Sequence, residues 1–538
     1  MPSGVPDIEL CGDRTLRIGM TRRRFLSWSG AVAALAFTPG ILGDTASSTG
    51  ASAPDSPLFA LGVASGDPLP DGVVLWTRLA PRPLARGGGM GARPIEVAWE
   101  VAADEAMTRP VRHGHAPATA ENGHAVHVDV RGLEPGREYF YRFAALGERS
   151  AVGRTVTAHA AGTDAPMTFA LASCQSWADG YYVAYADMAT HAPDVVFHLG
   201  DYIYEKPINR GGGRRHTTAM PESAARECLD LDDYRDRYAL YKLDPHLQQI
   251  HRTSPFVTTF DDHEVDNNWA ADIPEDGMTV PDFLVRRAHG LRAWWEHTPV
   301  RLAHRPYGAD IRAHRRLRFG TLAEFSVLDT RSHRSDQVNG DVDAPQDAAT
   351  ADPRRSILGP IQERWLLDGF ARSEARWNVL AHQTPIADLA RTLDGRRAVS
   401  MDGWSGYEAC RARILDGARE RGVTDLVSVV GDIHRNVVTD LRTSYRDESP
   451  TIGVELAGTS IASGADGRDS DDSDRALKAA SPHVRFGNAQ RGYVLNRLQR
   501  DRWDAEFRVA DSIGSPAERL HTRAVVTTET GRPEVDIV

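Results

Sequence analysis

After residue 165, short apolar runs alternate with longer stretches in which apolar residues recur at helical spacing. Five of the runs predict buried strands: "MTFALASC", "DVVFHLGD", "FVTTFDDHE", "RWNVLAHQ" and "DLVSVVGDIH". The helical spacing occupies residues 181–191, 231–243, 281–297 and 361–374. Residues 317–330 and 493–509 instead predict antiparallel hairpins. The pattern favours an α/β fold with mixed sheets flanked by helices over residues 165–530.

Residues 57–158 show a different pattern, in which strand-like runs are interrupted by turn signals about every 8–12 residues. Asp67-Pro68 and Asp71-Gly72 are two of these signals. This part of the sequence has no cluster of chemically reactive residues, and the polar linker "AHAAGTDAP" follows it. We therefore expect an N-terminal all-β sandwich that serves packing or recognition, followed by a second domain over residues 165–530.

Each of the five strand-like runs ends on polar side chains of the kind that bind metals. The carboxyl ends of strands line the ligand crevice in open α/β sheets, so we expect these side chains to converge. One acid after a strand would be weak support, because Gly-Asp is a common turn. Five such ends in one fold point to a metal or phosphate site. The candidates are Cys174, Asp201, Tyr204, Asp262, His263, Gln383, Asp432 and His434.

Two of these donors favour iron. The Tyr204 phenol has a pKa near 10, so it binds a metal well only where a strong Lewis acid takes its proton, which indicates Fe3+. A Cys174 thiolate suits iron and not magnesium or calcium. Taken singly, Tyr204 could be a core tyrosine with its hydroxyl bound to backbone, and Cys174 could be an inert buried thiol.

The remaining donors favour a second, harder ion. Asp201 can bridge two cations. The oxygen ligands Asp262, Gln383 and Asp432 suit an ion such as Ca2+. His434 could bind a metal or a phosphate.

The motifs "GDYIYE", "DDHE" and "GDIH" resemble the metallophosphoesterase pattern, in which the middle motif is usually Gly-Asn-His-Glu or -Asp and the last is Gly-His-x-His. Asp262 in place of that Asn, and Asp432 in place of that first His, are typical of the PhoD-like alkaline phosphatases. Segments along nearly the whole chain, such as "SCQSWADGYYVAYADMA" and "AGTSIASG", are similar to that family. The resemblance implies a sandwich-like N-terminal domain, a four-layer αββα catalytic domain, and an iron site with calcium.

The sequence departs from this family at His382-Gln383, where Gln-Gln or Asn-Gln is common. The ligand role therefore extends to Gln383, and a role for His382 stays open.

The expected reaction is hydrolysis of phosphate monoesters, with small phosphate esters as substrates. His263 is the candidate for holding the phosphate or protonating the leaving alcohol, and Asp201 and His434 are assigned to catalysis as well as to metal binding. A phosphodiesterase, including phospholipase D-type activity on phospholipid, is the alternative, because this family uses the same iron–calcium site on diesters. A non-catalytic binding protein is the remote alternative. A catalytically dead domain would be expected to lose ligands, and the candidate ligands are all present.

The net charge argues against one class of partner, and the N-terminus indicates the cellular compartment. The net charge of -11, from 63 Lys+Arg against 74 Asp+Glu, argues against a nucleic-acid partner. Residues 21–26 have the twin-arginine form, and the apolar run at 28–37 is too short to span a membrane. We expect a signal peptide over residues 1–53, cleaved between Thr45 and Ala53, with Met1 or Met20 as the true start. The protein would then be secreted through the twin-arginine translocation (Tat) machinery, without a transmembrane anchor.

Of the four cysteines, Cys11 lies in the predicted signal peptide. If Cys174 binds iron, Cys228 and Cys410 are left and could pair in the oxidising compartment.

Overall fold

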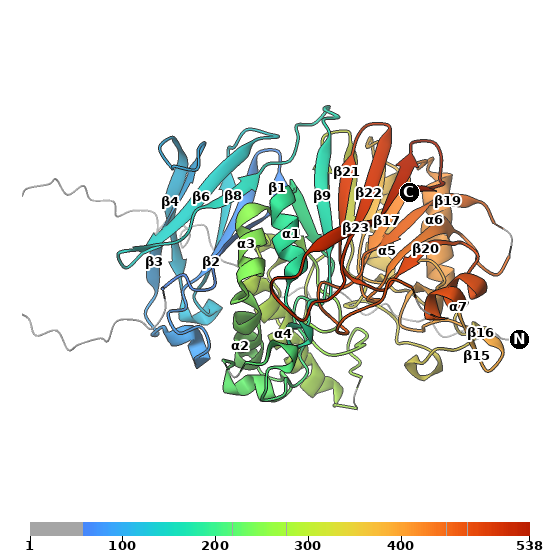
Figure 1. Ribbon diagram of the computed structural model, residues 1–538, viewed down its shortest axis with the longest axis horizontal. Coiled ribbons are helices and arrows are strands. Elements are labelled where there is room, and N and C mark those ends of the chain that lie inside the picture. Colours follow the sequence, from blue (N-terminus) through green and yellow to red (C-terminus); the bar gives the residue numbers. More distant parts are fainter. Residues whose placement is uncertain (1–56, 218, 276, 448, 471) are drawn as a thin grey trace, which may run out of the picture. The chain divides into compact units, whose positions relative to one another are not determined.

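Two large β-sheets lie face to face in the computed structural model, which describes residues 57–538 except 218, 276, 448 and 471 (Figure 1). The first sheet has ten strands in the order β24-β23-β22-β21-β9-β10-β11-β1-β2-β5. The second has seven strands in the order β12-β13-β14-β17-β19-β18-β20. In the first sheet β9, β10 and β11 run parallel, and in the second β13, β14, β17 and β19 do. Their carboxyl ends carry the predicted site residues.

The strands of the first sheet, in sheet order, are β24 (Asp536–Ile537), β23 (Leu520–Glu529), β22 (Arg502–Ala510), β21 (Arg491–Leu498), β9 (Met167–Ala172), β10 (Val195–His198), β11 (Phe256–Thr258), β1 (Val63–Leu69), β2 (Gly72–Arg78) and β5 (Ala125–Arg131). Those of the second are β12 (Arg315–Phe319), β13 (Ala323–Val327), β14 (Trp377–Ala381), β17 (Leu426–Val430), β19 (Thr451–Ala457), β18 (Asn436–Arg442) and β20 (Val484–Asn488).

Successive apolar side chains on the central strands enter two different cores, because neighbours on a strand point to opposite faces. Phe169 and Phe197 of the first sheet face the second sheet, where they pack on Phe325 at ring-centroid distances of 5.2 and 4.4 Å. Their neighbours Ala170 and Val196 face the helices instead. Burial on both faces explains why these strands read as continuous apolar runs.

Helices cover the outer face of each sheet (Figure 1). The first sheet is covered by α1 (Val183–His191), α2 (Leu231–Lys242), α3 (Pro245–Thr253) and α4 (Val280–His297). The second is covered by α5 (Gly359–Phe370) and α6 (Glu408–Glu420). A further helix, α7 (Asp472–Ala480), lies beside β20 and the two-stranded sheet of β15 (Arg391–Leu393) and β16 (Arg396–Ala398). The predicted four-layer αββα arrangement is confirmed.

The N-terminal region forms a sandwich that shares a sheet with the rest of the chain. One of its layers contains β4 (Pro110–Ala118), β3 (Ile95–Ala102), β6 (Glu138–Ala145), β7 (Glu148–Arg149) and β8 (Gly153–Val156). Its other layer is β1, β2 and β5, which extend the edge of the ten-stranded sheet beyond β11. Side chains of both layers, such as Val73 and Tyr141, share one core. The limits 57–158 and 165–530 stay a prediction, because this sheet continues from one region into the other.

Local sequence signals account for most elements and miss a few. Both predicted hairpins, β12–β13 and β21–β22, are confirmed. Helix α3 went unpredicted although its start is signalled, since Asp244 precedes Pro245 and its carboxylate accepts from the backbone N–H groups of His246 and Leu247. Helix α7 begins within residues 464–474, which read as a polar loop.

The suggested disulfide between Cys228 and Cys410 is wrong. Cys228 packs in the core between the first sheet and its helices, whereas Cys410 of α6 packs in the core outside the second sheet. Cys174, Cys228 and Cys410 are all buried free thiols. Cys228 and Cys410 are each enclosed by a different core, so they are small buried apolar residues rather than a bonded pair.

The predicted signal peptide and its cleavage site lie outside the described residues. Within residues 57–538, apart from the four exceptions, no helix combines the length and apolarity that crossing a membrane requires.

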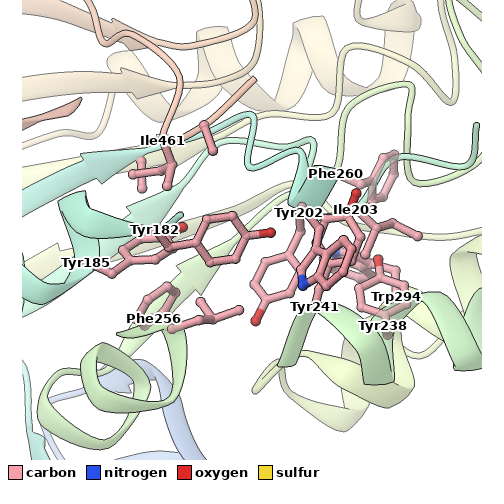
Figure 2. Packing of buried hydrophobic residues seen from close by; sticks show 14 of the residues in the cluster. Tyr182, Tyr185, Tyr202, Ile203, Tyr238, Tyr241, Phe256, Phe260, Trp294 and Ile461 are labelled. Atoms are coloured by element: carbon pink, nitrogen blue, oxygen red, sulfur yellow. The ribbon is translucent and has the colours of Figure 1, made fainter. Parts of the chain in front are cut away.

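A buried lysine lies in the aromatic core behind the first sheet. Figure 2 shows this core, in which Tyr202 and Tyr238 stack at 5.8 Å. Lys242 is 2% exposed, and its Nζ donates to the Tyr202 hydroxyl at 3.1 Å and lies 4.2 Å from the Trp76 ring centroid. Burial lowers the pKa of Lys242 from 10.5 to about 7. The folded protein therefore holds this amine neutral at alkaline pH.

We expect Lys242→Met to change how stability depends on pH. Between pH 7 and 10.5 the unfolded chain holds a proton on Lys242 that the folded chain lacks, so wild-type stability rises with pH, by at most about 5 kcal/mol. The melting temperature of the wild type, measured relative to that of Lys242→Met, should be higher at pH 9.5 than at pH 7. The exposed Lys478→Met variant is the control, with an unchanging difference from wild type. A constant difference for Lys242→Met as well would contradict the assignment.

Candidate metal centre

Backbone turns of an uncommon kind follow the strands that carry the predicted ligands. Cys174 follows β9 with φ 57°, and Asp201 follows β10 with φ 55°. After β17, Asp432 has φ 67° and His434 has φ 54°. Residues other than glycine rarely adopt this left-handed region, and when they do they cluster at functional sites. These unfavourable backbone conformations therefore indicate a functional site at the carboxyl ends of the strands, where the turns orient the side chains.

Four of the predicted ligands come together at these turns. The ligand atoms of Cys174, Asp201 and His434 all lie within 4.8 Å of one another. The Tyr204 hydroxyl donates to Asp201 Oδ2 at 3.0 Å and lies 3.2 Å from His434 Nε2. Sulfur, phenol, carboxylate and imidazole donors thus surround one point.

A second group shares Asp201 with the first. The ligand atoms of Asp201, Asp262 and His263 also lie within 4.8 Å of one another. The His263 ring packs on the Tyr204 ring with centroids 4.2 Å apart, and its Nδ1 lies 2.7 Å from Glu205 Oε2. Asp201 therefore lies between the two groups, which is the position that a bridging carboxylate requires.

The residues fit a bound cation by their burial as well as by their chemistry. Asp201 is 2% exposed, and its Oδ1 has no hydrogen-bond partner among the residues that the structure describes. Burial and the nearby Asp201 carboxylate raise the pKa values of both Cys174 and Tyr204 well above their usual range. Anionic sulfur and oxygen at this point are therefore stable only beside a positive charge.

Comparisons with known proteins show the family of the chain. The PhoD-like phosphatase family matches residues 169–507, and its N-terminal domain family matches residues 44–159. Alkaline phosphatase D of Bacillus subtilis (strain 168) is 43% identical over 518 residues, which are 94% of this chain and 86% of that relative. The chain belongs to the PhoD-like phosphatase family. The resemblance read from the motifs is confirmed.

Two solved structures are similar in fold to this PhoD-like phosphatase. The structure of PhoD matches with a TM-score of 0.87 at 41% identity, covering 91% of this chain and 93% of that one. The purple acid phosphatase PPD1 from yellow lupin seeds matches with a TM-score of 0.53 at 12% identity, covering 87% and 73%. The second likeness is one of fold alone.

The pKa values of the two histidines of the site are shifted in opposite directions. Burial alone would lower the pKa of His263, but the carboxylates of Asp262, Asp201 and Glu205 together raise it well above its usual range. Burial, followed by the charges of Arg491 and His263, lowers the pKa of His434 to about 4. These surroundings favour the imidazolium form of His263 and the neutral imidazole of His434, which is the form that binds metals.

The other predicted oxygen ligands lie in different surroundings. Asp432 is partly exposed, and burial together with Asp402 and Asp262 raises its pKa to about 6. Gln383 is fully buried, where its Oε1 accepts from Thr330 at 2.6 Å and its Nε2 donates to Thr259 at 2.8 Å. The calcium roles of Asp262, Gln383 and Asp432 stay predictions.

His382 points away from Gln383, as adjacent residues at the end of a strand do. Its Nε2 lies 3.1 Å from Ser428 Oγ, and its ring packs against Trp404. Burial lowers its pKa to about 3. These contacts assign His382 to the core of the second sheet.

Glu264 is a residue of the site that the sequence reading did not single out. Its buried carboxylate accepts three backbone N–H groups, from Asp201 at 3.1 Å, Tyr202 at 2.6 Å and Asp261 at 2.8 Å. One side chain thus joins the turn after β10 to the turn after β11. Its place in "DDHE" was the available signal.

Arg331 is a second such residue, and it joins the two sheets. From the turn after β13 its Nε donates to Asp261 at 2.6 Å, and its Nη1 and Nη2 donate to Asp402 at 2.7 and 2.8 Å. Its Nη2 also lies 3.6 Å from Asp262. A fully buried guanidinium among three carboxylates removes repulsion that would otherwise push the Asp262 turn apart. No local pattern around Arg331 signals this role.

We expect Glu264→Gln to loosen both turns. The amide replaces one acceptor oxygen with an N–H2 group that must face a backbone donor, which costs about 1–3 kcal/mol. The variant should melt at lower temperature than wild type and retain less metal after dialysis. Glu518→Gln, on an exposed loop, is the control and should match wild type. An unchanged melting temperature and metal content in Glu264→Gln would contradict the role of Glu264 in holding the two turns together.

Proposed function

We propose that the protein is an exported alkaline phosphatase that hydrolyses phosphate monoesters at an iron–calcium centre. The observation that carries this proposal is the shared carboxylate of Asp201, which belongs both to the group with Cys174 and His434 and to the group with Asp262 and His263. Membership of the PhoD-like phosphatase family supports a metal-dependent phosphoesterase. The substrates are then small phosphate esters.

The donor types support a separate position for each ion. Fe3+ would be held by Cys174, Asp201, Tyr204 and His434, since thiolate, phenolate and imidazole suit iron. Ca2+ would be held by Asp262, Gln383 and Asp432, with Asp201 shared between the ions. Bound ions would supply Lewis-acid stabilisation to the charge that develops on the phosphoryl oxygens.

The residues of the chain provide the proton chemistry. Because Glu205 holds His263 Nδ1, the ring presents Nε2, 3.9 Å from Asp262 Oδ2, at the centre of the site. A protonated His263 can donate a hydrogen bond to a phosphoryl oxygen and then a proton to the leaving alcohol. The neutral His434 serves as a ligand rather than as an acid. Glu264 and Arg331 hold the turns that aim these groups.

Export through the Tat machinery is also part of the proposal. It rests on the twin-arginine form of residues 21–26, which lie outside the described part of the chain. That route carries proteins already folded, so the metal would be acquired before export.

Iron bound to the Tyr204 phenolate should colour the protein. Metal analysis of protein made with its own signal peptide should find iron and calcium, and the visible absorption band should vanish in Tyr204→Phe. Tyr181→Phe, whose ring lies outside the cluster, is the control and should keep the band. Iron-containing wild-type protein without colour would refute the assignment of Tyr204.

His263→Gln should lower kcat for glycerol 2-phosphate by roughly 10²–10⁴-fold with iron content retained, because the leaving alkoxide needs a proton and a positioned acid contributes about that much. The same assay on bis-p-nitrophenyl phosphate and phosphatidylcholine tests substrate class. Turnover of the diester or the lipid alone would overturn the monoesterase proposal. Wild-type kcat in His263→Gln would overturn the role of His263.

A further inference from the structure

The loop after β19 wraps around the first metal-binding turn. In this loop, the backbone N–H of Ile461 donates to the Ser173 carbonyl at 3.0 Å. Those of Ala462 and Ser463 donate to the Cys174 carbonyl at 3.3 and 3.2 Å. The Ile461 side chain anchors the loop in the same core as Tyr182 (Figure 2). The loop is therefore fixed directly against the turn that carries the Cys174 thiol.

Ser463 extends from this loop to the Tyr204 oxygen. Its Oγ lies 2.7 Å from the Tyr204 hydroxyl and 2.7 Å from the Cys174 carbonyl, and it accepts from the backbone N–H of Ser176 at 3.0 Å. Ser463 is 1% exposed, so water does not compete for these bonds. The hydroxyl has a single proton, which it can direct to either of the two oxygens.

The acceptor that receives this proton depends on the state of Tyr204. A neutral phenol donates its own proton to Asp201 Oδ2, and is then a weak acceptor. A phenolate is an anionic acceptor and forms the stronger, charge-assisted bond. The N–H of Ser176 holds the Ser463 oxygen in place, so the hydroxyl can turn toward Tyr204 without moving the loop.

We propose that Ser463 is a positioning residue that donates a hydrogen bond to the metal-bound Tyr204 oxygen and withdraws charge from it. This inference rests on the proposed iron site. A donor to the phenolate oxygen lowers the energy of its electrons, so more energy is needed to move an electron from the phenolate to Fe3+. Ser463 would then set the colour of the centre and raise the reduction potential of its iron.

The test is the visible absorption band of iron-loaded protein. Ser463→Ala should hold iron as wild type does and shift the band to longer wavelength, and its iron should be harder to reduce. Ser460→Ala is the matched control, because Ser460 lies in the same loop and donates to the Ser463 carbonyl at 2.8 Å without contacting Tyr204. Its band should stay at the wild-type position.

A wild-type band in iron-containing Ser463→Ala would overturn the inference and leave the proposed function standing. If Ser463→Ala loses iron, Ser463→Thr decides, since it keeps the hydroxyl. Iron and a wild-type band in Ser463→Thr support the hydroxyl's role, and loss of iron there too contradicts it. Iron-containing wild-type protein without colour would overturn both the inference and the iron–phenolate assignment.

Discussion

The buried carboxylate of Asp201 is the constraint on which the rest of the site depends. One of its oxygens is held by Tyr204, and the other has no partner within the described residues. Burying such an anion costs several kcal/mol unless a cation or a proton compensates for the lost water. The groups around it are ligands that a cation can use. The same feature thus makes the site unfavourable when empty and favourable when a metal is bound.

Holding several carboxylates together requires compensation elsewhere. Glu264 is compensated by three backbone N–H groups, and Asp261 and Asp402 by the guanidinium of Arg331. These N–H groups and the guanidinium are already bonded to other carboxylates, so they do not compensate Asp201. The first sheet supplies Glu264 and the second supplies Arg331, so the two-sheet architecture keeps both turns in place and leaves Asp201 Oδ1 open to a bound ion.

The sequence was most informative where burial itself creates the pattern. Strands β9, β10, β14 and β17 are apolar on both faces, so their position and the polar residues at their ends could be predicted. Strands β1, β2 and β5 gave no sign that they extend the ten-stranded sheet, because their apolar residues fit a separate sandwich equally well. The pairing of Cys228 with Cys410 failed for a related reason, since a redox argument contains no information on distance.

The sequence by itself determined the kinds of donor, their places at strand ends and the family to which the chain belongs. Only the tertiary structure decided which distant groups complete the site. Ser463 lies 259 residues from Tyr204, and Arg331 lies 70 residues from Asp261. Periodicity records whether a residue is buried, which is a local property. A hydrogen bond between distant segments depends on how two sheets pack, and that register is set by the whole core.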